Sequence, residues 1–174
     1  MKRIYLFIVV SIILVFSLLS CYEIAAPEVQ IWWTSPLAWN VYQFDPLFDS
    51  SYTSYVIADS VTFWVRNGVD AKLLGYYAEF YRIAGVGEEN IFLYQGLPYN
   101  LELNLRASPR REDTVRTSLF NWPIHVREAV DSMYSFPETE WRSLLVRVHF
   151  FGEDAYGEGK EFNVTHDYTL IRIE

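Results

Sequence analysis

The three histidines are the first residues to consider for catalytic or metal chemistry, and they lie far apart. His125, His149 and His166 are separated by 24 and 17 residues. This is not a local metal-ligand spacing, although neighbouring strands could bring two of them together. His149 alternates with Val148 and Phe150, so we expect it to face away from the core. The simplest prediction is three scattered surface histidines.

Carboxylates gather near the end of the chain, at Glu153, Asp154, Glu158 and Glu161. Loop carboxylates can hold calcium in weak extracellular sites, which makes Asp154 and Glu158 candidate ligands. Their spacing matches no EF-hand, and a solvated acidic turn that keeps strand edges from pairing is favoured. A carboxylate pair for glycoside hydrolysis stays open, because the fold sets the separation of such groups.

Short motifs that bring catalytic geometry with them are missing from the sequence. There is no Gly-x-Ser-x-Gly elbow, no His-Glu-x-x-His zinc helix and no phosphate loop. The only cysteine is Cys21. The sequence therefore predicts a non-enzymatic protein without a metal or other cofactor.

Aromatic residues are unusually frequent, with six Trp, 13 Tyr and 12 Phe in 174 residues. Trp32, Trp33 and Trp39 precede the regular strand patterns. Planar side chains on a sheet surface can stack on sugars or anchor protein partners, so these three are candidate ligand-stacking residues. The alternative is that this segment folds over one end of the domain and fills it.

The N-terminus is typical of an exported protein. Lys2 and Arg3 precede an apolar run from Ile4 to Leu19, a length between that of a signal-peptide core and that of a membrane span. The run ends in Leu18, Leu19, Ser20 and Cys21, which resemble the lipobox of bacterial lipoproteins. The alternative is an uncleaved N-terminal anchor with an incidental cysteine.

The lipobox resemblance implies cleavage between Ser20 and Cys21, a diacylglycerol thioether on Cys21, and a membrane-bound mature protein. Residues 1–20 are then the signal peptide, 21–30 a lipidated tether, and 31–174 a single domain. It also implies an extracytoplasmic location on the cell membrane or the outer membrane, and Tyr22 after the cysteine favours outer-membrane sorting where that membrane exists.

The charge of the chain excludes one class of partner. The formal net charge is −8, and it becomes about −10 once Lys2 and Arg3 leave with the signal peptide. Nucleic acid requires a basic surface, so we expect no such partner. An envelope protein or a glycan remains the expected partner.

Alternating apolar residues predict a mainly β domain. The clearest examples are 61–66, 101–106 and 142–151, with further strands at 72–83, 91–94, 115–119 and 162–173. Spacings of three and four at Val126, Ala129, Val130 and Met133 predict one short helix. About seven strands and at most one short helix favour two packed antiparallel sheets.

Two stretches resemble bacterial immunoglobulin-like or fibronectin-like domains. DSVTFWVRNGVDA is similar to an early strand and turn of such modules, and residues 144–173 look like their closing hairpin, with Asp154 to Gly157 as an Asp-x-x-Gly turn. The resemblance implies an immunoglobulin-like β-sandwich that binds or spaces other molecules. It departs from true immunoglobulin domains in lacking paired cysteines, and Trp64 is in the opposite phase from Phe63.

Three hypotheses for function follow. The first is a lipid-anchored, non-catalytic interaction or structural module of the cell envelope. The second is a carbohydrate-binding module that uses Trp32, Trp33 or Trp39. The third is a hydrolase with dispersed catalytic residues, which would require histidines or carboxylates to converge in a pocket.

Overall fold

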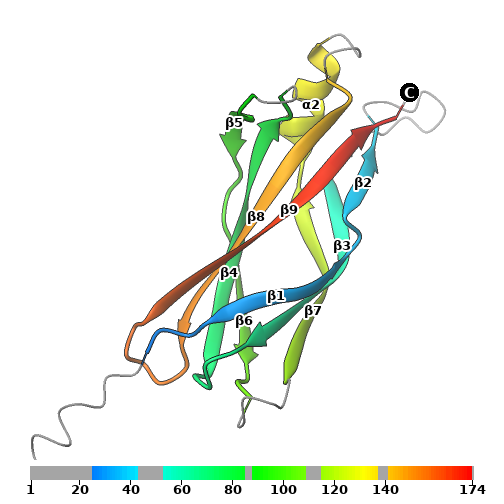
Figure 1. Cartoon of the computed structure of the whole chain (residues 1–174). Helices are drawn as coiled ribbons and strands as arrows, with labels where there is room; N and C mark the ends of the chain where they lie inside the picture. The colour runs from blue at the N-terminus through cyan, green and yellow to red at the C-terminus, as the bar shows by residue number, and fades with distance from the viewer. Residues whose placement is uncertain (1–24, 43–52, 85–87, 109–114, 137–140, 174) are drawn as a thin grey trace, which may run out of the picture.

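The computed structural model describes residues 25–42, 53–84, 88–108, 115–136 and 141–173, so Ser20 and Cys21 lie outside the described residues. Nine strands and one helix form within these ranges (Figure 1). They are β1 (Val29–Ser35), β2 (Ala38–Val41), β3 (Tyr55–Val65), β4 (Ala71–Arg82), β5 (Ile91–Gln95), β6 (Tyr99–Leu105), β7 (Arg116–His125), α2 (Arg127–Ser135), β8 (Ser143–Asp154) and β9 (Glu161–Arg172).

The strands form two sheets that pack face to face. The smaller sheet has the order β1-β3-β7, and the larger has the order β2-β9-β8-β4-β5, with β6 also paired to β4. Neighbours are antiparallel except for β2 and β9, which run parallel, so the larger sheet is mixed. The predicted mainly β architecture is confirmed.

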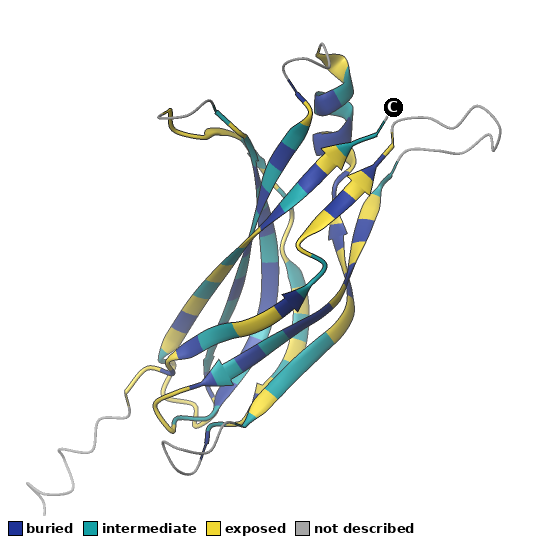
Figure 2. Cartoon of the chain, turned by 45° about the vertical axis from the view of Figure 1, so that its right-hand side comes forward, coloured by how far each residue is buried: buried dark blue, intermediate teal, exposed yellow. Residues whose placement is uncertain are grey.

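Alternation explains why these segments became strands. On β8, Leu144, Val146, Val148 and Phe150 are all fully buried, and the residues between them are half-buried on the other face. Side chains alternate across a strand, so one face of each sheet closes on the core. Figure 2 shows this as successive bands of buried and exposed residues along the strands. Together the inward residues form one apolar core between the sheets.

The predicted helix is present as α2, at one end of the sandwich. Its buried residues are Ala129, Val130 and Met133, which are the positions that the spacing singled out. No helix of the described residues is long and apolar enough to cross a membrane.

The segment that contains β1 and β2 differs from its prediction in two ways. The expected tether through residue 30 is shorter, because Val29 is buried and begins β1. The segment also divides between the sheets, with β1 on β3 and β2 on β9.

The prediction for Trp39 is corrected by this division. Trp39 lies on β2 and is only 9% exposed. Its indole Nε1 donates to the carbonyl of Ile57 on β3 at 2.8 Å, and its ring packs against Tyr168 with 4.9 Å between centroids. Because both its face and its donor are used inside the fold, Trp39 is a core residue and not a ligand-stacking residue.

Candidate functional site

Polar and aromatic residues gather on the outer face of the larger sheet, where β4, β8 and β9 lie side by side. They occupy the strand positions that alternate with core residues, so the packing of the core points them outward. We call this set the polar cluster; it comprises Tyr77, Glu79, Tyr81, Arg147, His149, Thr165 and Asp167.

Strand register arranges the polar cluster in rows. Tyr77, His149 and Thr165 are cross-strand neighbours in one row. Glu79, Arg147 and Asp167 form the next row. Directly opposed side chains on one face of a sheet lie within contact distance, so residues far apart in sequence meet here.

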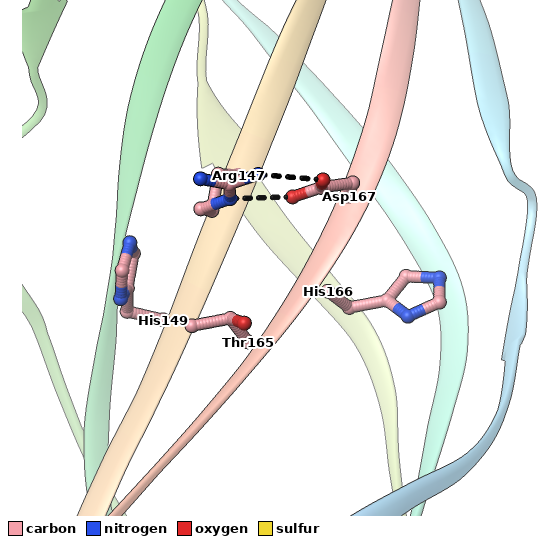
Figure 3. Close-up of a pocket in the computed structure, with 5 residues that line it drawn as sticks. All are labelled: Arg147, His149, Thr165, His166 and Asp167. Carbon is pink, nitrogen blue, oxygen red and sulfur yellow. Dashed lines mark hydrogen bonds and ion pairs between the residues drawn. The ribbon is translucent and has the colours of Figure 1, made fainter.

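An arginine–aspartate pair closes the β9 side of the cluster (Figure 3). The Arg147 guanidinium donates to Asp167 through Nε at 2.8 Å and through Nη2 at 2.9 Å. These bonds lower the pKa of Asp167 and raise the pKa of Arg147. This bidentate geometry fixes the orientation of the two side chains relative to each other.

A second hydrogen-bonded pair lies on the β4 side. Glu79 Oε2 is 2.8 Å from His149 Nε2 and accepts a bond of 2.7 Å from the Tyr81 hydroxyl. Burial opposes ionisation of Glu79, but these hydrogen bonds outweigh it and lower its pKa. The same bond to the carboxylate raises the pKa of Tyr81.

His149 faces away from the core as predicted, but it is not a loose surface residue. Its side chain is 15% exposed, and that of its partner Glu79 is 18% exposed. Its ring stacks on Tyr77 with 4.6 Å between centroids and 5° between planes. His149 is therefore held on both its face and its edge.

A shallow depression of about 450 Å³ accompanies the cluster, lined by Arg147, His149, Thr165, His166 and Asp167. His166 is the cross-strand neighbour of Val148, and Figure 3 shows its ring pointing away from His149. Burial lowers the pKa of His166. The strands do bring two histidines close in the sheet, but they point to opposite faces.

No metal centre forms within the ranges that the structure describes, where no three His, Cys, Asp or Glu side chains could hold an ion together. His125 is exposed at the end of β7, on the smaller sheet.

The proposed calcium ligands have other roles. Asp154 is buried, and its carboxylate accepts backbone N–H bonds from Lys160 and Tyr156 at 2.8 Å each and from Glu158 at 3.2 Å. These bonds, led by that from Lys160, lower the pKa of Asp154. Glu158 contributes its backbone to this turn while its side chain is solvated. We therefore correct the calcium prediction: Asp154 organises the β8–β9 turn.

The two remaining stacking candidates are accessible on the opposite sheet. Trp32 and Trp33 are both about half exposed on the outer side of β1. Trp32 contacts Trp64 edge to face at 5.7 Å, and the Arg116 guanidinium lies 4.1 Å above the Trp32 ring. Both tryptophans can present a ring face or edge to a partner.

Sequence reasoning missed most of the polar cluster. Glu79, Arg147 and Asp167 carry no motif, and 88 residues separate the first from the last. The available signal was phase: Glu79 and Arg147 each stand between two apolar residues in a strand pattern, and Asp167 precedes the buried Tyr168. Phase indicates which face a residue occupies, but not which strand lies beside it.

Comparison with known proteins leaves the chain without an assigned family. No family model matches it, and no curated protein matches it. Among solved structures, it is similar to the sporulation control protein Spo0M from Bacillus subtilis, with a TM-score of 0.42 and 10% sequence identity. The match covers 87% of this chain and 51% of that one, so the chain spans about half the length of Spo0M.

Proposed function

We propose that this protein is a lipid-anchored, non-catalytic binding module of the cell envelope, and that the polar cluster is its binding surface. The observation that carries the proposal is the pairing of polar side chains in the cluster: Arg147 with Asp167, and Glu79 with His149. The lipobox at Cys21 supports the anchor, and it implies an extracytoplasmic location on the cell membrane or the outer membrane.

The paired side chains favour recognition over proton transfer. The cluster does bring a histidine and two carboxylates together, which is what the hydrolase hypothesis required. A general base, however, needs a nitrogen or oxygen that can reach the substrate proton. His149 and Glu79 are bonded to each other and their side chains are only 15% and 18% exposed, and both oxygens of the Asp167 carboxylate are bonded to Arg147.

The same arrangement suits a polar partner. Arg147 and Asp167 keep side-chain exposures of 39% and 43%, so their free donors and acceptors remain accessible. Thr165 is exposed beside them, and the Tyr77–His149 stack supplies an adjoining flat surface. Rigid polar groups next to planar rings can recognise a protein loop or a glycan without reorganising.

We further infer that the sandwich is immunoglobulin-like. Such folds place strands A, B and E in one sheet and C, F and G in the other. The order β1-β3-β7 opposite β9-β8-β4 corresponds to that division. Tyr76 and Phe80 supply the aromatic core residues of β4, where true immunoglobulin domains carry a tryptophan.

Site-specific photocrosslinking of the full-length protein in its cell tests the binding surface. A photoreactive amino acid at Thr165 should capture a recurrent protein or glycan, whereas the same group at the exposed Asn40 on β2 should not. Mass spectrometry of the N-terminal peptide should show a diacylated Cys21.

The two parts of the proposal can fail separately. An unmodified Cys21 would remove the anchor, and equal capture at Thr165 and Asn40 would remove the polar cluster as the binding surface.

A carbohydrate-binding module that uses Trp32 and Trp33 is the second candidate. It is favoured by the exposure of two adjacent indoles on one strand. A stacked glycan would change the tryptophan fluorescence, and Trp33→Phe would reduce that change. Unaltered emission across a panel of envelope glycans would argue against this candidate.

A further inference from the structure

The outer side of the smaller sheet carries a set of exposed apolar residues. Five of them are between 46% and 65% exposed. We call this surface the aromatic face; these residues are Trp32 and Trp33 on β1, Tyr55 and Ile57 on β3, and Phe120 on β7. Exposed apolar surface of this kind, rimmed by polar groups, marks an interaction site.

Two backbone irregularities create this surface. The register between β1 and β3 shifts between Ile31 and Trp33, so two consecutive tryptophans point outward. On β7, Asn121 has φ of 51°, and both Phe120 and Asn121 are exposed. An asparagine tolerates this left-handed conformation better than most residues. A regular strand would have turned one of each pair toward the core.

The aromatic face is nearly neutral, although the chain as a whole is acidic. Among the outward positions of these three strands, all within the described residues, Asp59 is the one carboxylate. Arg116 lies over Trp32, and Arg66, just after β3, lies 5.2 Å from the Trp64 ring while pairing with the exposed Glu28. A chain of net charge −8 thus keeps this side apolar and close to neutral, with two arginines beside its tryptophans.

The lipid anchor would hold this face close to the membrane. This step rests on the proposed lipidation of Cys21. Eight residues separate Cys21 from Val29, the start of β1. Even fully extended they span at most about 28 Å, at roughly 3.5 Å per residue. The start of β1 therefore stays within about 28 Å of the lipid, and the aromatic face can reach the bilayer surface.

We propose that the aromatic face lies against the headgroup region of the membrane that holds the Cys21 lipid. Tryptophan and tyrosine are favoured at membrane–water interfaces, and arginine is attracted to anionic headgroups. The two sheets form opposite sides of the sandwich, so this orientation turns the polar cluster away from the membrane. The anchor and the aromatic face together provide two membrane contacts instead of one.

Depth-dependent fluorescence quenching tests this orientation. The full-length lipidated protein is reconstituted into vesicles of phosphatidylethanolamine and phosphatidylglycerol that contain a phospholipid brominated near the top of its acyl chain. Bromolipid should quench the wild-type emission, and Trp32→Phe with Trp33→Phe should lose more than half of that quenching. Trp39, Trp122 and Trp141 are buried and should contribute little.

A tryptophan on the opposite sheet is the matched control. Thr165→Trp, introduced together with the two phenylalanine substitutions, should add emission that bromolipid does not quench. Arg116→Glu keeps both tryptophans and should reduce the quenching in vesicles that contain phosphatidylglycerol. This second variant keeps the test decisive if the double substitution impairs folding.

Mass spectrometry of the same sample shows whether Cys21 is lipidated, so a wrong orientation can be told apart from a missing anchor. If Cys21 is lipidated and bromolipid leaves Trp32 and Trp33 unquenched, the orientation is wrong and the anchor stands. Quenching of the indole introduced by Thr165→Trp would also contradict the proposed orientation. An emission change with soluble envelope glycan but not with bromolipid would assign the face to carbohydrate, and an unmodified Cys21 would contradict the proposed function itself.

Discussion

At the scale of single residues, Asp154 shows how one buried carboxylate can organise a turn. It receives three backbone N–H groups from the loop between β8 and β9. Buried polar groups need such partners, and a charged acceptor makes the bonds stronger. The acidic residues near this loop suggested a calcium site. For Asp154, the structure gives a different role, as the acceptor that organises the turn.

Asp154→Asn should destabilise the protein in a pH-dependent manner. The folded state lowers the pKa of Asp154 below its ordinary value of 3.8. Its contribution is therefore present above that value and is lost as the pH falls through the lower, folded pKa. Thermal unfolding should show a lower Tm for the variant at pH 7 and a shrinking difference at more acidic pH.

The exposed Glu158→Gln in the same turn is the control for this prediction, and its Tm should stay near that of the wild type. A difference between Asp154→Asn and wild type that persisted undiminished below the folded pKa would show that the negative charge is not what stabilises the turn.

At the scale of elements, β4 requires one glycine in order to pair with both β6 and β8. Its register with both β6 and β8 shifts between Leu73 and Gly75. A Cβ at Gly75 would come within 2.3 Å of the Tyr99 carbonyl oxygen and 2.8 Å of the Phe151 ring. The close approach of three strands at this bulge therefore requires the absence of a side chain.

Gly75→Ala should lower the free energy of unfolding by about 1–3 kcal/mol, the usual range for overpacking. Gly96→Ala is the matched control, because its Cβ would meet the Ala78 carbonyl oxygen at 3.5 Å, an ordinary contact. Urea unfolding of both variants makes the comparison. Equal midpoints for the two would mean that β4 shifts to accommodate the methyl group without loss.

The elements also show what could be predicted from the sequence. Alternation was sufficient for β6, β8, β9 and the second half of β3, because each buries one face more deeply than the other. It failed for the first segment, where the bulge at Trp32 and Trp33 breaks the period. The division of that segment between two sheets depends on distant partners, such as the Ile57 carbonyl that receives the Trp39 indole.

The candidate site was less predictable than the fold for the same reason. His149 could be placed on an outer face from its phase alone. Its partner Glu79, however, is 70 residues away, and only the pairing of β4 with β8 brings the two together. Register between distant strands is a property of the whole sheet, and no local pattern encodes it.

At the scale of the whole molecule, one core joins both sheets and the helix. The buried cluster extends from Val29 on β1 to Leu170 on β9 and includes Met133 of α2. A domain of this size with a continuous core is expected to unfold in a single cooperative transition.

Met133→Ala should therefore destabilise the entire domain by about 2–5 kcal/mol. Far-ultraviolet circular dichroism and tryptophan fluorescence should shift together to a lower midpoint, because α2 shares the core. The exposed Asn40→Ser should leave the free energy of unfolding within about 0.5 kcal/mol of the wild type. An early loss of helical signal with unchanged fluorescence would instead make α2 an independent unit.

The parallel pairing of β2 with β9 has a mechanical consequence. Ala38 to Val41 pair in order with Thr169 to Arg172, so the two strands point in the same direction. Tension applied between the N-terminal side of β2 and the end of β9 would pull these strands in opposite directions along their length. All the hydrogen bonds of that pair would then bear the load together in shear, and none could open one at a time. With the anchor proposed at Cys21, this pairing would resist a pull on the end of β9.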